Sequence, residues 1–230
     1  NFIGARLDPV GDAVQDAAAI GAGHRGPGTK GGGRSAGGGG GIGSAVVRRF
    51  VSEGARVAVA DVFADSAKAV AEPLGDAAIA VQFDASDPAS VEAMVEKTVG
   101  HFGRLDILHN NAAIQNEAQR QKDLDVVNLD VAAWDMAMAV NVRGAMLMSK
   151  YVIPHMIAGG GGSIIHSASG FGVQGEATLT AYGTSKAALI QLNRMIATQY
   201  GKQKVRSNCM VIGFVLTPLA VESTPDVVKD

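Results

Sequence analysis

The chain has 230 residues, which is enough for one domain with a substantial hydrophobic core. Its net charge of -2, with 47% hydrophobic and 18% charged residues, gives no reason to expect a nucleic acid or a membrane surface as a partner. Cys209 is the only cysteine, which excludes a disulfide framework and a zinc site of paired thiols. No run reaches the ~18 apolar residues of a membrane span, and the N-terminus lacks the layout of a secretory signal. We therefore expect a cytoplasmic protein without a metal site.

From residue 43 onward, segments with helical spacing alternate with short runs rich in β-branched residues. The spacing predicts helices at 43–53, 65–72, 87–103, 131–158 and 180–200. The intervening apolar runs predict strands at 55–62, 78–84, 105–113, 163–169 and 205–213. Strands joined by helix-length crossovers favour an α/β fold, in which one doubly wound parallel sheet carries helices on both faces. We expect a single domain.

The N-terminal region differs from the rest, because half of the thirty glycines lie within the first 43 residues. A central first strand is normally rich in Val and Ile, yet the expected place, residues 31–36, reads Gly-Gly-Gly-Arg-Ser-Ala. The first strand is therefore poorly defined. It forms on backbone pairing alone, or the region is locally disordered, or the sequence there is corrupted. We expect residues 1–30 to be irregular and residues 31–230 to form a dinucleotide-binding catalytic domain.

Two glycine motifs are candidates for a phosphate-binding loop. "GAGHRG" at 21–26 fits G-x-G-x-x-G, but the glycines and proline that follow cannot begin a helix. Gly37, Gly41 and Gly43 are followed directly by a helix, and Asp61 lies eighteen residues after Gly43, near the spacing expected of a ribose-binding acid. We favour the second motif, with a glycine-rich linker as the alternative reading.

The segment "AYGTSK" at 181–186 carries the strongest chemical signal. Tyr182 and Lys186 are four residues apart on a predicted helix, so their side chains project from one face. A lysine ammonium near a phenol favours the phenolate and is expected to lower the pKa of Tyr182 toward neutrality. A solvated surface pair is the alternative for this motif taken alone.

Taken together, six segments resemble the short-chain dehydrogenase/reductase family in order and spacing, over about residues 37–218. The resemblance implies a Rossmann-like fold and oxidoreduction with a nicotinamide cofactor. The matching segments are "GGGGGIG" (37–43), "DILHNNAA" (106–113), "NVRG" (141–144), "GSIIHSAS" (162–169), "YGTSK" (182–186) and "VIGFVLTP" (211–218).

The resemblance implies a role for each matching residue. Tyr182 would be the general acid/base, and Lys186 would lower its pKa and bind the nicotinamide ribose. Ser169, thirteen residues before Tyr182, would bond the substrate oxygen, whereas Ser167 is two residues out of position. Asn141 would hold a water of the proton relay, or it is a buried polar residue bonded to backbone.

The same resemblance predicts the cofactor and its contacts. Asp61 would bind both ribose hydroxyls and repel a 2′-phosphate, and apolar Val62 follows it, which favours NAD over NADP. The full set of expected cofactor-binding residues is Gly37, Gly41, Ile42, Gly43, Asp61, Asp84, Ala85, Asn111, Tyr182, Lys186, Val215 and Thr217.

Several features depart from the family pattern. His166 stands where asparagine is common, Ala113 replaces a glycine, and Ile212 replaces a proline. Family members also continue past Thr217 through a substrate-covering segment and an edge strand, so we expect the C-terminal edge strand to be missing. The family commonly forms tetramers through the helices at 131–158 and 180–200, which predicts a homo-oligomer, unless their apolar residues only cover the sheet.

These observations predict an oxidoreductase that moves a hydride between NAD and a secondary alcohol or ketone. The alternative is a dinucleotide-binding module, or an inactive relative without efficient turnover. The partner is a small molecule whose identity the sequence does not give.

Overall fold

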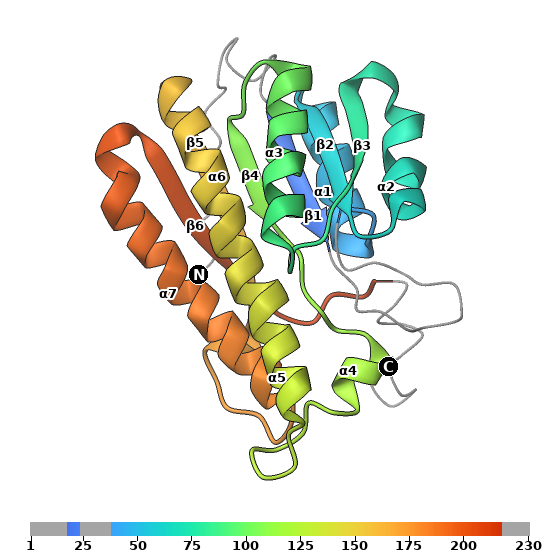
Figure 1. The fold of residues 1–230 in the computed structure, drawn as a ribbon, viewed down its shortest axis with the longest axis vertical. Coiled ribbons are helices and arrows are strands. Elements are labelled where there is room, and N and C mark those ends of the chain that lie inside the picture. The colour runs from blue at the N-terminus through green and yellow to red at the C-terminus, as the bar shows by residue number, and fades with distance from the viewer. Residues whose placement is uncertain (1–17, 24–37, 218–230) are drawn as a thin grey trace.

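The computed structural model describes residues 18–23 and 38–217, and its centre is a parallel six-stranded sheet in the order β3-β2-β1-β4-β5-β6 (Figure 1). In the described residues the sheet ends at β6. The strands are β1 (Ala18–Gly23), β2 (Arg56–Asp61), β3 (Ala78–Gln82), β4 (Ile107–Asn110), β5 (Gly162–Ser169) and β6 (Val205–Ile212).

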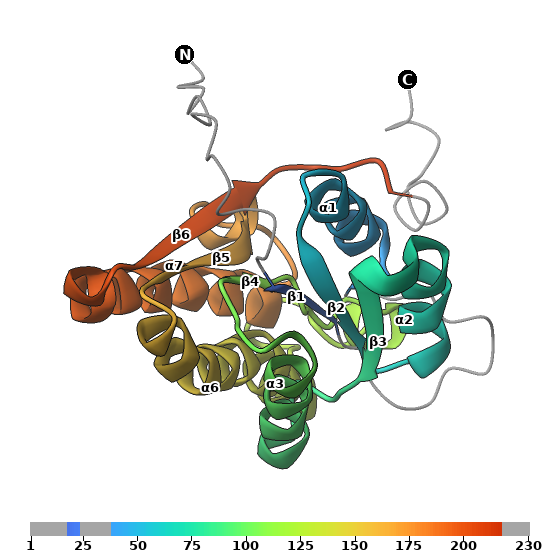
Figure 2. The same ribbon diagram turned by 90° about the horizontal axis from the view of Figure 1, so that it is seen from above.

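Helices cover both faces of this sheet, as the alternation of strands and helices predicted. Figure 2 shows α3 and α6 on one side and α1 on the other. In β2, Ala58 and Ala60 pack into the core under α3, α6 and α7, whereas Val57 and Val59 pack under α1 and α2. Neighbouring residues of a strand point to opposite faces, so a continuous apolar run fits a strand that is buried on both sides.

The predicted helices and strands from residue 43 onward all occur, with ends that differ by a few residues. The long helix expected at 131–158 is continuous but contains a π-helical turn, η2. The helices are α1 (Gly41–Ser52), α2 (Ala64–Ala71), η1 (Glu72–Ala77), α3 (Pro88–Phe102), α4 (Glu117–Arg120), α5 (Val131–Ala137), η2 (Met138–Gly144), α6 (Ala145–Ala158), η3 (Gly170–Gly172), α7 (Thr180–Tyr200) and η4 (Gly201–Gln203).

The first strand lies earlier in the sequence than expected. β1 takes the central place between β2 and β4, with Gly23 opposite Asp61. The expected position at 31–36 lies outside the described residues, and irregular structure throughout 1–30 is wrong for residues 18–23. The backbone N–H and C=O groups of β1 pair with β2 on one side and with β4 on the other. These hydrogen bonds stabilise the strand without large side chains.

Part of α7 covers the sheet. Leu189 and Ile196 are 1% and 3% exposed and belong to the core. For these two residues, the alternative that the apolar side chains only cover the sheet is correct. Within the described residues, no helix has the length and apolar content needed to cross a membrane.

Close packing joins η2 to the loop after β3. A Cβ at Gly144 would lie 2.8 Å from the carbonyl oxygen of Ala85. The backbone cannot withdraw as a flexible side chain could, so this contact requires glycine.

We therefore expect Gly144→Ala to lower the free energy of unfolding by about 1–3 kcal/mol, as overpacked sites do. Gly100→Ala is the matched control, because its added Cβ in α3 meets nothing within 4 Å. That change should raise stability by about 0.5–1 kcal/mol. Urea denaturation of both variants measures the difference, and equal effects would contradict the packing argument.

Two histidines are buried inside the sheet. His109 Nε2 lies 2.9 Å from Ser167 Oγ, and His166 Nδ1 lies 3.3 Å from Asn110 Nδ2. His109 Nδ1 and His166 Nε2 have no hydrogen-bond partner among the described residues. Burial, and secondarily the buried ammonium of Lys186, lowers the pKa of each imidazole to about 4. Both rings are therefore neutral at pH 7.

These histidines predict acid sensitivity. An unfolded histidine titrates near pH 6.5, so between pH 6.5 and 4 the unfolded chain binds protons that the folded chain does not. Stability must fall as the pH falls through this window. We expect His166→Asn to flatten that fall in denaturation curves at fixed ionic strength, whereas exposed His101→Asn should leave it unchanged. Identical slopes for wild type and His166→Asn would contradict this assignment.

Candidate active site

The residues expected to carry the chemistry meet at the carboxyl end of β5 and the first two turns of α7. Ser169 is the last residue of β5, and Tyr182 is the third residue of α7. Lys186 follows one helical turn later, on the same face as Tyr182. The structure thus brings Ser169, Tyr182 and Lys186 together.

The Tyr182 phenol is hydrogen-bonded to the Ser169 hydroxyl. Ser169 Oγ also accepts a hydrogen bond from the backbone N–H of Phe171 at 3.3 Å. The Phe171 and Tyr182 rings are arranged edge to face, with their centroids 6.2 Å apart. Burial raises the pKa of Tyr182, and the bond from Ser169 acts in the opposite direction. The expected lowering of this pKa is therefore wrong for this structure.

The position of the Lys186 ammonium explains why the pKa of Tyr182 is not lowered. The side chain is 2% exposed, and Nζ donates a 2.7 Å hydrogen bond to the carbonyl oxygen of Ser167. It lies 5.5 Å from the centroid of the Tyr182 ring. Burial lowers the pKa of Lys186 to about 8, so the group is still a cation at pH 7. The alternative of a solvated surface pair is wrong, because Lys186 is buried.

Ser167, the rival of Ser169, points elsewhere. Its hydroxyl lies 2.9 Å from the buried Nε2 of His109. Its role in the described structure is to fix Lys186 through its carbonyl, and the hydroxyl beside Tyr182 belongs to Ser169.

Asn141 lies in the π-helical turn η2 and is 1% exposed. Its Oδ1 accepts the backbone N–H of Ile114 at 2.9 Å, and its Nδ2 donates to Ser185 Oγ at 2.9 Å. Ser185 Oγ in turn donates to the carbonyl of Tyr182 at 2.7 Å. The side chain therefore links the long helix to α7, and single π-helical turns are frequent at functional sites.

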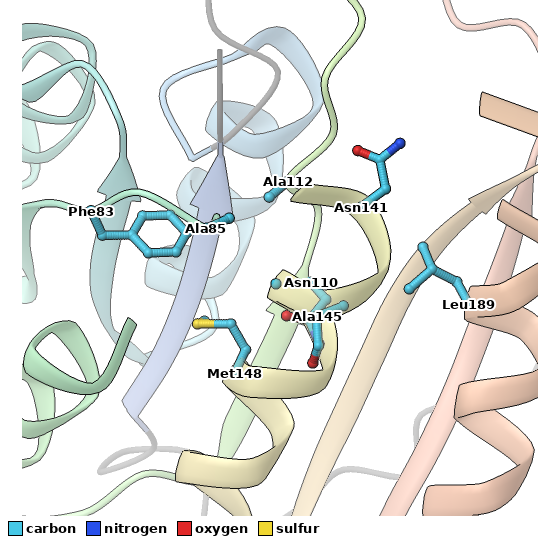
Figure 3. A pocket seen from close by; sticks show the side chains of 9 residues that line it. Phe83, Ala85, Asn110, Ala112, Asn141, Ala145, Met148 and Leu189 are labelled. Atoms are coloured by element: carbon cyan, nitrogen blue, oxygen red, sulfur yellow. The ribbon is translucent and has the colours of Figure 1, made fainter. Parts of the chain in front are cut away.

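Asn141 also lines a small pocket (Figure 3). Its lining includes Asn110 at the end of β4, Met148 of α6 and Leu189 of α7. Ser169, Tyr182 and Lys186 are not among the residues that line it.

The expected phosphate loop is described in part. Gly37 lies outside the described residues, and Gly41 and Gly43 open α1, with Ile42 half-buried between them. Gly40 is the N-cap, and among the described residues no side chain caps the first amides of α1.

Gly39, which the motif did not single out, fits closely against α2. A Cβ at Gly39 would lie 2.7 Å from the Cβ and carbonyl oxygen of Ser66. The Gly39 backbone N–H also donates to Asp61 Oδ2 at 3.2 Å. Only the folded structure reveals this requirement, because neither contact follows from the glycine spacing.

Asp61 ends β2, as expected for a ribose-binding acid, and is fully buried. Its Oδ1 accepts the backbone N–H of Phe63 at 3.1 Å, while Oδ2 bonds Gly39. The carboxylate therefore connects the sheet, the glycine loop and the turn into α2.

The remaining expected cofactor residues lie along the same edge of the sheet. Asp84 Oδ1 accepts bonds from the backbone N–H and hydroxyl of Ser86, which forms a tight turn around buried Ala85. Asn111 is buried directly after β4, whereas Val215 is 43% exposed and accepts a bond from the Thr217 N–H.

Asp123 is a buried acid that sequence reasoning missed. Its Oδ1 accepts the Ala181 N–H at 2.7 Å, and its Oδ2 accepts the Tyr182 N–H at 2.9 Å. The residue lies in the linker 115–130, where several other acids occur, so no spacing distinguished it from them.

Comparison with known proteins gives consistent matches. A family model described as short chain dehydrogenase matches residues 36–227. A 7α-hydroxysteroid dehydrogenase of Bacteroides fragilis is 35% identical over 193 residues, covering 83% of this chain and 73% of that protein. A sorbitol dehydrogenase of Cereibacter sphaeroides is 38% identical over 176 residues, covering 76% of this chain and 66% of that protein.

A solved structure agrees with these matches. The crystal structure of 3-ketoacyl-(acyl-carrier-protein) reductase from Brucella melitensis complexed with NADH has a TM-score of 0.77 and 29% identity, covering 91% of this chain and 80% of that one. Together with the parallel sheet of Figure 1, these matches show that the chain belongs to the short-chain dehydrogenase/reductase family and is an oxidoreductase with its Rossmann fold.

Proposed function

We propose that this oxidoreductase interconverts a secondary alcohol and a ketone with NAD, using Tyr182 as the general acid/base. The observation that supports this most is the Tyr182 phenol, hydrogen-bonded to Ser169 with the buried ammonium of Lys186 5.5 Å from its ring. A nicotinamide cofactor would supply the hydride acceptor or donor at this edge of the sheet.

In alcohol oxidation, the Tyr182 oxygen accepts the proton of the substrate hydroxyl as a hydride leaves the adjacent carbon. Ser169 donates a hydrogen bond to the substrate oxygen and holds it in line with Tyr182. Lys186 is still a cation at pH 7, and we propose that its charge favours the phenolate during the reaction, although burial keeps the pKa of Tyr182 raised in the described structure. The reverse steps protonate the oxygen of a ketone.

The residues at the loop fit a dinucleotide. The uncapped first turn of α1 offers backbone N–H groups to a pyrophosphate, and Gly39 lets the loop approach α2 closely. Asp61 ends β2 where a ribose hydroxyl would be bound. The adenine side would be formed by Asp84 and Ala85, and the nicotinamide side by Asn111, Lys186, Val215 and Thr217.

The substrate is proposed only as a class. The similar proteins named above are a 7α-hydroxysteroid dehydrogenase and a sorbitol dehydrogenase, and an alcohol substrate fits the proton transfer described here. Phe171 beside Tyr182, and exposed Val173 in the same segment, favour a substrate with an apolar body.

We also propose a homo-oligomer, formed through α6 and α7. Met146 and Ile157 on α6 and Met195 on α7 are between 38% and 46% exposed, which leaves apolar surface on both helices. A cytoplasmic location stays a prediction.

The proposal predicts that Tyr182→Phe lowers turnover by roughly 10²–10⁴-fold, the contribution of a general acid/base. The affinity for NADH should stay within about twofold in a fluorescence titration, because the phenyl ring keeps its packing. Tyr200→Phe, at the other end of α7, is the matched control and should turn over normally.

A panel of cyclic, steroid-like and short aliphatic alcohols with NAD measures turnover. Turnover retained by Tyr182→Phe would contradict the mechanism. NADH binding by the wild-type protein with no turnover of any alcohol would favour the alternative, a dinucleotide-binding module.

The assignment of Asp61 predicts that the wild-type protein binds NADH at least tenfold more tightly than NADPH, because its carboxylate repels a 2′-phosphate. Asp61→Asn removes the charge and keeps one of the two acceptor oxygens, so the ratio of the two dissociation constants should move toward NADPH by about tenfold or more even though one backbone bond is lost. Asp76→Asn, at an exposed acid of η1 outside the expected cofactor contacts, is the control and should leave the ratio unchanged. Equal affinities in the wild type would contradict the preference for NAD.

A further inference from the structure

Tyr182 and Lys186 both belong to α7. The start of this helix is capped by Asp123, which is not part of the helix. The N-cap residue of α7, Leu179, has a left-handed backbone (φ 62°) and no capping side chain. The two carboxylate oxygens of Asp123 instead accept the N–H groups of Ala181 and Tyr182, at 2.7 and 2.9 Å. Asp123 is 1% exposed and lies 59 positions before Tyr182. A distant acid thus fills the role that an N-cap side chain usually has.

The backbone beside Asp123 strengthens this contact. The Leu179 N–H donates to the Asp123 carbonyl at 2.8 Å, and Thr180 Oγ1 donates to the Leu124 carbonyl at 2.7 Å. A left-handed conformation at a residue other than glycine persists only where its surroundings hold it. The first turn of a helix is also where its backbone groups lack intrahelical partners. Contacts from residues 123–124 therefore fix the turn that contains Tyr182.

The capping of α7 is important for Tyr182 because the other two residues of the site are held by β5. Lys186 is bound to the Ser167 carbonyl of β5, and Ser169 ends the same strand. Tyr182 lies one turn closer to the helix end, where loss of the cap would let it move. A misplacement of about 1 Å in a catalytic group can cost on the order of 10²-fold in rate.

The segment around Asp123 is itself bound to the other helix of the site. The Asp123 N–H donates to the Gln119 carbonyl at 3.0 Å, and Gln119 Nε2 donates to the Ala133 carbonyl of α5 at 2.6 Å. Asp130 Oδ1 caps the start of α5. Since α5 continues into η2, the same segment contacts both the helix of Asn141 and the helix of Tyr182.

We propose that Asp123 is a positioning residue for the general acid/base. Its carboxylate holds the first turn of α7 so that the Tyr182 hydroxyl stays in hydrogen-bond reach of Ser169. Its negative charge also complements the positive end of the α7 dipole. The proposal rests on the proposed function, because it assigns Asp123 an effect on turnover.

The test compares Asp123→Ala and Asp123→Asn with Asp125→Asn. Asp125 lies in the same segment, but it is exposed and caps the turn of Val127 and Asn128. Three quantities are measured for each variant. They are kcat with the best alcohol of the panel, the dissociation constant of NADH, and hydrogen exchange of the amides at 180–184.

Asp123→Ala should lower kcat by about 10–100-fold while the NADH affinity stays within about twofold. Exchange at 180–184 should accelerate at least tenfold, and Asp125→Asn should change none of the three. Asp123→Asn keeps one acceptor oxygen and should fall between Asp123→Ala and wild type. If Asp123→Ala does not fold, Asp123→Asn carries the comparison.

Unchanged exchange at 180–184 would overturn the proposal, as would accelerated exchange with normal kcat. A loss of NADH affinity equal to the loss of kcat would also overturn it, because that indicates general unfolding. If the wild-type protein turns over no alcohol, the proposed function fails, and accelerated exchange still supports the positioning of Tyr182.

Discussion

The hydrogen bond from the Lys186 ammonium to the Ser167 carbonyl is the contact on which the candidate site depends. A buried cation is costly unless it is hydrogen-bonded, so this bond determines where α7 can lie against β5. Ser169 is two residues further along β5, and Tyr182 is one turn earlier in α7. Their hydrogen bond follows from the same alignment of strand and helix.

The same bond accounts for the electrostatics of the region. It holds the ammonium near the two buried histidines, where burial first and this charge second lower the pKa of His109 and His166. Burial then decides the pKa of the phenol and raises it. A charge one helical turn away is therefore not enough to predict a pKa, because the direction depends on which atom the charge binds.

Much of the fold could be predicted from the sequence because its signals are local. The spacing predicted a helix at 87–103, and α3 follows Asp87, whose carboxylate accepts the Ala89 N–H at 3.0 Å. The spacing of Tyr182 and Lys186 placed both on one face of a helix, since helix periodicity needs no knowledge of the rest of the chain.

The features that could not be predicted depend on contacts between distant segments. β1 holds the centre of the sheet because β2 and β4 pair with its backbone, and side-chain propensity carries no information about that. Asp123 gains its role only when the linker folds against α7. Gly39 is required only because Ser66 of α2 packs against it.

The buried carboxylate of Asp61 limits which residues can replace it. It accepts two backbone N–H groups, one from the glycine loop and one from the turn into α2. A residue chosen there to accommodate a different dinucleotide must also offer acceptors to both amides, or the loop loses its connection to the sheet. The proposed choice of coenzyme and the local fold thus depend on one side chain, so a substitution that changes the first also changes the second.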